Sequence, residues 1–74
     1  MKLINHIKQH RARLDLTQQE LAERVGVRRQ TIIAVEKRQY VPSALLAFKI
    51  ARALGMKADE LFELVGDKKK RKKK

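Results

Sequence analysis

This 74-residue sequence predicts an all-α fold of five short helices. Apolar residues recur three and four positions apart through most of the chain, which is the spacing that lines one face of a helix. Thr17 and Glu20 stand at the spacing of a capping box, so a helix should begin there. Gly26 should end that helix, because glycine adopts the left-handed conformation of a helix C-terminus at little steric cost.

The predicted helices cover about residues 2–14, 18–25, 29–38, 44–54 and 58–65, and no strand is expected. The first helix should turn Leu3 and Ile4 inward, because they share helical spacing with later apolar residues. Pro42 disfavours a helical conformation of the residue before it, so residues 39–42 should form a loop. Ser43 then supplies the side-chain cap of the fourth helix.

Composition and charge narrow the class of protein. The net charge is +11, and residues 68–74 are all Lys or Arg. We expect one helix-turn-helix domain over residues 1–66 and a disordered basic tail over residues 67–74, because a block of like charges repels itself. The sequence has no cysteine and no apolar run long enough for a membrane span. Such a chain favours polyanions, with nucleic acid before anionic membrane surfaces.

The segment 17–36 predicts a helix, a tight turn and a second helix, the arrangement that places a helix in the DNA major groove. The outward side of the second helix should carry four base-reading residues, Arg29, Gln30, Ile33 and Ala34. Arginine can pair with guanine, glutamine with adenine, and an apolar side chain with the thymine methyl group. The alternative is an ordinary solvated helix face.

Several longer stretches recur in the order and spacing of a known family. They are Leu16-Thr-Gln-Gln-Glu-Leu-Ala-Glu-Arg-Val-Gly, Arg29-Gln-Thr-Ile, Val35-Glu-Lys, Tyr40-Val-Pro-Ser, Ala51-Arg-Ala-Leu-Gly and Asp59-Glu-Leu-Phe. Over about residues 3–65 the chain resembles the Cro/C1-type (XRE-like) helix-turn-helix family, to which phage repressors belong. The resemblance implies a compact five-helix, lambda-repressor-like DNA-binding domain that usually acts as a dimer on a two-fold operator. It implies a regulator or an antitoxin, and not an enzyme.

Both ends of the third predicted helix depart from that family's usual pattern. Arg28 stands where a serine commonly caps the helix, and its side chain cannot accept a backbone N–H bond. Lys37 and Arg38 follow Glu36 where the family usually has Asn-Gly, so the C-terminal glycine is missing. These changes replace residues that stabilise helix ends by positively charged residues on the side expected to face DNA.

Phosphate contacts are expected around the same helices. Gln18 is the first residue of its helix, where backbone N–H groups point outward and suit an anion, and the family often uses a glutamine there. The other candidates for phosphate contact are Arg28, Lys37, Arg38 and Arg13. The alternative for each is a solvated surface residue.

Arg11 and Glu36 are charged, yet both fall on the inward faces of their predicted helices. Buried charges are rarely left unpaired. Related repressor domains form an internal ion pair from such residues, so the resemblance implies a structural Arg11–Glu36 pair here.

No metal, cofactor or catalytic residue is expected. His6 and His10 stand four residues apart and could share a metal ion, but no cysteine and no obvious third ligand accompany them. No Ser-His-Asp order, glycine-rich phosphate loop or pair of catalytic carboxylates stands out.

We interpret the sequence as a transcriptional regulator, and specifically a repressor, that binds double-stranded DNA as a homodimer. We expect it in the cytoplasm, associated with the nucleoid. The candidate dimer surface is the fifth helix with the end of the fourth, including Phe62 and Leu64. One alternative is a DNA-binding antitoxin or adaptor that acts mainly through a protein partner. Another is RNA binding led by the basic tail.

Overall fold

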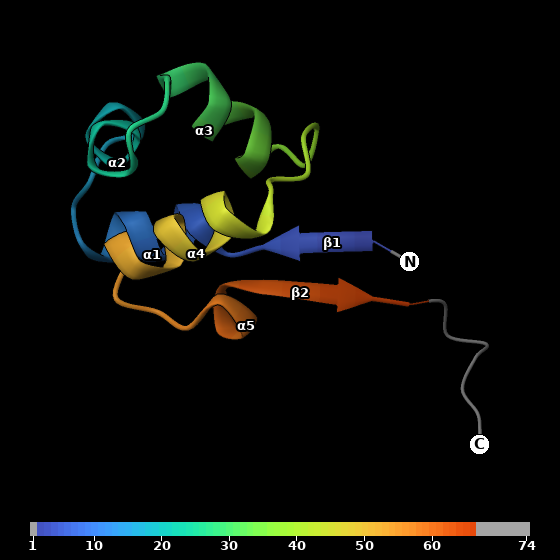
Figure 1. The fold of residues 1–74 in the computed structure, drawn as a ribbon. Helices are drawn as coiled ribbons and strands as arrows, with labels where there is room; N and C mark the ends of the chain where they lie inside the picture. The colour runs from blue at the N-terminus through green and yellow to red at the C-terminus, as the bar shows by residue number, and fades with distance from the viewer. Residues whose placement is uncertain (1, 67–74) are drawn as a thin grey trace.

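A computed structural model describes residues 2–66 of the chain, and these residues form a helical domain closed by a small sheet. The elements follow in the order β1 (Lys2–Asn5), α1 (Ile7–Arg13), α2 (Gln18–Val25), α3 (Arg29–Glu36), α4 (Ala44–Ala53), α5 (Ala58–Leu61) and β2 (Phe62–Val65). Figure 1 shows α2 and α3 at one end of the molecule, α1 and α4 in the middle, and the sheet and α5 at the other end. None of the helices in this described part is long and apolar enough to cross a membrane.

Two predicted helices are wrong at their outer ends. Residues 2–5 were expected to begin the first helix and residues 62–65 to end the last one, but both stretches are strands. They pair antiparallel, with Leu3 opposite Leu64 and Asn5 opposite Phe62. The strands gain from each other the backbone hydrogen bonds that a helix would have supplied within one segment. The all-α expectation is therefore corrected to a mostly helical domain with a two-stranded sheet.

The core lies where α1, α2, α3, α4 and α5 meet. Its buried apolar residues are Ile7, Leu16, Leu21, Ala22, Val25, Ile32, Val35, Leu46, Ile50, Ala51, Leu54 and Leu61. Every helix contributes at least one of them, so the helices hold one another in place through a shared apolar contact region. Leu14, the residue after the end of α1, is exposed.

The predicted helix-end signals are present in α2 and α4. The Thr17 hydroxyl accepts the backbone N–H of Glu20, and the Glu20 carboxylate accepts that of Thr17, which completes the capping box. Gly26 has φ 76° and ψ 34°, the left-handed conformation that ends α2. Ser43 caps α4 by accepting the N–H of Leu46 at 3.1 Å. Of these signals, the left-handed residue Gly26 sets the direction in which the chain leaves α2 toward α3.

Candidate nucleic-acid interface

Helix α3 has one buried side and one open side. Ile32 and Val35 are buried against the other helices. Of the four predicted base-reading residues, Arg29 and Gln30 are exposed, while Ile33 and Ala34 are partly exposed. Figure 1 shows α3 along the outer edge of the molecule, opposite the sheet. The open side therefore presents long polar side chains near the helix start and short apolar ones beyond them, a mixture suited to base edges.

The start of α3 carries a cation in place of a capping side chain. Arg28 is the N-cap residue, with an extended backbone and no side-chain hydrogen bond to the helix. The first N–H groups of α3 thus have no side-chain acceptor within the described chain, and the exposed guanidinium stands next to them. Unpaired N–H groups and a guanidinium at one helix end together favour an anion such as a phosphate.

The starts of α2 and α3 lie on one shallow hollow. Its lining residues are Arg11, Thr17, Gln18, Gln19 and Arg29. The hollow therefore brings the predicted phosphate residue Gln18 next to the predicted base-reading residue Arg29. This juxtaposition depends on the turn at Gly26, because the two residues belong to different helices.

The capping box at this hollow also holds a charge. The backbone N–H of Thr17 donates to the Glu20 carboxylate at 2.8 Å, and this bond, helped by the Thr17 hydroxyl, lowers the pKa of Glu20. A carboxylate in the first turn of α2 also interacts favourably with the positive end of the helix dipole. The start of α2 is thus held in a single geometry beside the hollow.

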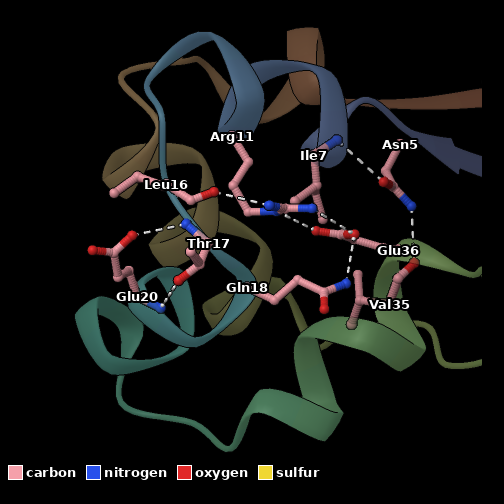
Figure 2. A network of polar contacts seen from close by, with 9 residues as sticks. All are labelled: Asn5, Ile7, Arg11, Leu16, Thr17, Gln18, Glu20, Val35 and Glu36. Atoms are coloured by element: carbon pink, nitrogen blue, oxygen red, sulfur yellow. Dashed lines mark hydrogen bonds and ion pairs between the residues drawn. The ribbon is translucent and has the colours of Figure 1, made fainter.

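An ion pair beneath the two helices joins α1 to the end of α3 (Figure 2). Arg11 Nε donates to Glu36 Oε2 at 2.9 Å, and the side chains are only 14% and 8% exposed. A second guanidinium nitrogen of Arg11 donates to the Leu16 carbonyl at 2.8 Å. The pair implied by the family resemblance is therefore present, and its charges are largely removed from water.

Two further bonds in this network were not expected from the sequence. Gln18 Nε2 donates to Glu36 Oε1 at 3.1 Å, so the predicted phosphate residue already has one partner inside the protein. Asn5 Nδ2 donates to the Val35 carbonyl at 2.9 Å, while Asn5 Oδ1 accepts the N–H of Ile7 at 3.2 Å. Figure 2 shows the bonds from Gln18 and Asn5 converging on the last turn of α3. Sequence spacing gives no signal for them, because the partners lie on different elements.

The end of α3 is closed by residues that usually avoid this geometry. The N–H of Gln39 bonds the Ala34 carbonyl at 2.9 Å and the N–H of Arg38 bonds the Val35 carbonyl at 3.0 Å, as in a Schellman motif. Arg38 therefore adopts φ 63°, where glycine is the usual residue. Lys37 and Arg38 are both exposed, so the end of α3 carries two cations.

Arg13 lies apart from the other predicted phosphate residues. Its guanidinium is 3.8 Å from the sulfur of Met56, in the connection between α4 and α5. The remaining candidates are distributed over the starts of α2 and α3 and the end of α3.

The surroundings of the two histidines do not form a metal site within residues 2–66. His6 Nε2 is 2.9 Å from Glu63 Oε1, which links the start of α1 to β2. His10 Nδ1 is buried and has no hydrogen-bond partner among the described residues. Within residues 2–66, no group of three histidine or acidic side chains is arranged to hold a metal ion.

Comparison with known proteins assigns this arrangement to a family. The helix-turn-helix family model matches residues 7–61. The chain is 69% identical over 49 residues to an uncharacterized HTH-type transcriptional regulator of Methanothermobacter thermautotrophicus, covering 66% of this chain and 71% of that protein. It is 52% identical over 60 residues to the uncharacterized HTH-type transcriptional regulator YgzD of Bacillus subtilis, covering 81% and 91%.

A solved structure has a similar fold over most of the chain. The crystal structure of the clp gene regulator ClgR from Corynebacterium glutamicum superimposes with a TM-score of 0.70 over 73% of this chain, at 26% sequence identity. The match spans 57% of that chain, so the regulator contains further residues with no counterpart in this alignment.

Proposed function

Because this chain belongs to the Cro/C1-type (XRE-like) helix-turn-helix family, we propose that it is a sequence-specific repressor that reads the major groove with the open side of α3. The observation that carries the proposal is the shared hollow between Gln18 and Arg29. A phosphate-binding helix start and a base-reading helix start must reach one DNA surface together, and this hollow brings them together.

The base contacts are assigned to Arg29, Gln30, Ile33 and Ala34, in order from the start of α3. Arg29 and Gln30 carry the long donors that reach guanine and adenine edges. Ile33 and Ala34 supply short apolar contacts to thymine methyl groups. Phosphates on either side bind Gln18 and Arg28 at the helix starts, and Lys37 and Arg38 at the end of α3.

A homodimer doubles the sequence that one short helix can read, with half-sites about one helical turn apart. We assign the dimer surface to the sheet face of Leu3 and Leu64, which are directly opposite and so share a face. Leu64 is 68% exposed, and Leu3 lines a hollow with the exposed Tyr40 and Val41. This surface replaces the fifth helix with the end of the fourth, which we expected from the sequence, because residues 62–65 leave the helix and run along the sheet.

The reading face is tested by selecting preferred duplexes from a random pool and measuring affinity for them. Arg29→Ala with Gln30→Ala should cost about 1–3 kcal/mol for each bidentate base pairing that is removed and flatten the preference at those positions. The matched control is Arg24→Ala with Gln9→Ala, which removes an exposed arginine and an exposed glutamine elsewhere. Equal losses of affinity in the two variants would assign the binding to general charge and reject the docking.

A further inference from the structure

A second surface of α4 combines large apolar side chains with exposed cations. Leu45 and Phe48 are 67% and 63% exposed, although the neighbouring Leu46 and Ile50 are buried in the core. Leu45 and Phe48 stand three residues apart, so they lie one turn apart on the same helix face. We call this surface the α4 patch; its residues are Leu45, Phe48, Met56, Lys49, Arg52 and Lys57.

The α4 patch is hollowed. Its residues line one open depression between α4 and the connection to α5, and no residue of α3, β1 or β2 lines it. The surface is therefore separate from both the reading face and the proposed dimer face. A contiguous apolar surface that is rimmed by polar residues is the kind of surface that another molecule covers.

The charge around the depression indicates which kind of molecule could cover it. Lys49, Arg52 and Lys57 are exposed, and no carboxylate of residues 2–66 lies within 4.0 Å of their charged groups. Asp59 contributes the single carboxylate of the rim. The rim is therefore net positive, so a covering molecule gains most if it brings negative charge to the rim and apolar groups to the centre.

Three kinds of molecule could cover the depression, and they differ in how well they supply both negative charge and apolar groups. DNA would supply the negative charge, but its phosphates would leave Leu45 and Phe48 without apolar contact. A second copy docked by the same face would bring two positive rims together, because such an interface is formed by the same surface of both copies. An amphipathic protein segment with acidic flanks satisfies both the centre and the rim.

We propose that the α4 patch is a docking site for an acidic amphipathic helix of a partner protein. Leu45 and Phe48 receive its apolar anchors, and Lys49, Arg52 and Lys57 pair with its carboxylates. Apolar anchors at the centre with charges at the rim is the arrangement by which helices bind in grooves. A protein bound there leaves α3 free, so DNA and the partner bind together.

The probe is a labelled helical peptide of ~14 residues, with Leu or Phe at every third or fourth position and Glu on both flanks. A scrambled peptide of the same composition controls for general attraction to a chain of charge +11. The ordered peptide should bind the full chain at least ~10-fold more tightly than the scrambled one. Amide shifts in the NMR spectrum should locate it at residues 45–57.

Leu45→Gln with Phe48→Gln should abolish that preference for the ordered peptide while DNA affinity is unchanged. The matched control is Leu64→Gln, which removes an equally exposed leucine from the sheet and should bind the peptide like the parent. The melting temperature of each variant verifies folding. Equal binding of both peptides, or shifts located on the sheet, would overturn the proposal. So would sedimentation showing that the α4 variant, and not Leu64→Gln, loses self-association.

Discussion

Arg38 has a backbone conformation that costs free energy for any residue with a Cβ. Its φ of 63° is required because its N–H and that of Gln39 close the end of α3. A left-handed residue other than glycine costs roughly 1–2 kcal/mol. The chain keeps a cation beside the expected DNA surface at the expense of this strain, so stability and DNA affinity have opposite requirements at this position.

Replacing Arg38 by glycine should therefore stabilise the fold by up to about 1 kcal/mol, after the added entropy of the unfolded chain is subtracted. The same change should weaken DNA binding and make its dependence on salt shallower, because a cation is removed. Denaturant unfolding and a salt series measure the two effects. Lys37→Gly is the control, since Lys37 has φ −82° and no strain to relieve. A glycine that destabilises both positions equally would contradict the strain.

Arg11 and Glu36 show how burial changes the value of a charge pair. An exposed pair contributes little to stability, but these side chains are mostly removed from water and share their bonds with Gln18 and Leu16. Removing one member leaves the other charge buried with too few partners. We therefore expect the pair to define how α1 lies against α3, whatever its net contribution to stability.

Arg11→Met and Glu36→Leu should each destabilise the domain by up to about 3–5 kcal/mol, whereas the double variant should cost less than the sum of the two. The measurement is a double-mutant cycle by chemical denaturation of all four proteins. Single variants that unfold like the parent would show that the charges are solvated in solution.

At the scale of elements, Asn5 connects the sheet to α1 and α3. Asn5 is the last residue of β1, and its side chain bonds both the first turn of α1 and the last turn of α3. One side chain thus connects three elements. The two hydrogen bonds of its amide can be tested separately, because the oxygen accepts from α1 and the nitrogen donates to α3.

Asn5→Asp should retain the acceptor for the N–H of Ile7 but lose the donor to the Val35 carbonyl, while Asn5→Ala should lose both. We expect a destabilisation of about 1–3 kcal/mol for alanine. Aspartate should destabilise at least as much, because a carboxylate oxygen then faces the Val35 carbonyl in place of the donor. Denaturant unfolding measures the order, and DNA affinity reports any shift of α3. An aspartate variant clearly more stable than the alanine variant would show that the bond to α3 contributes little.

Local patterns predicted the elements whose causes are local. Thr17 with Glu20, Gly26 and Ser43 are end signals within a few residues of the structure they produce, and they were confirmed. The strands were missed because Leu3 and Ile4 fit either a helix or a strand by their spacing. Their partners lie at the other end of the described chain, so no local window contains the deciding contact.

The candidate site was predictable to a similar depth. Exposure of Arg29 and Gln30 followed from helical geometry and agrees with the structure. The bond from Gln18 to Glu36 depends on three helices meeting, and the strain at Arg38 depends on how α3 ends; neither is encoded in spacing. The contact of Arg13 with Met56 was likewise not encoded in spacing, and the phosphate role of Arg13 stays a prediction.

At the scale of the whole molecule, positive charge is divided between the domain and the sequence after it. Residues 67–74, predicted to be a basic tail, lie outside the described residues, and residues 68–74 are all Lys or Arg. Each cation that neutralises a DNA phosphate releases counterions without reading sequence. The division therefore predicts separate contributions to affinity and to specificity.

Removing residues 68–74 should weaken binding to specific and random duplexes by a similar factor and leave the melting temperature nearly unchanged. The slope of log K against log salt should become shallower by roughly 0.9 for each DNA phosphate that is no longer neutralised. Affinities of the full chain and of residues 1–67 over a salt series provide the measurement. A truncation that loses only specific binding would show that these residues read sequence, and equal slopes would show that they do not touch DNA.

The pairing of β1 with β2 also sets the order in which this domain can be completed during synthesis. Lys2–Asn5 leave the ribosome before any of the helices, yet their partner Phe62–Val65 is among the last described segments to emerge. At roughly 5–20 residues per second, β1 waits for seconds while the helices between them can already pack. A chain cut short before residue 62 would carry its reading helix but an unpaired first strand. An unpaired strand edge promotes aggregation and degradation. Pairing of β1 with β2 therefore protects only those chains whose synthesis has passed residue 65.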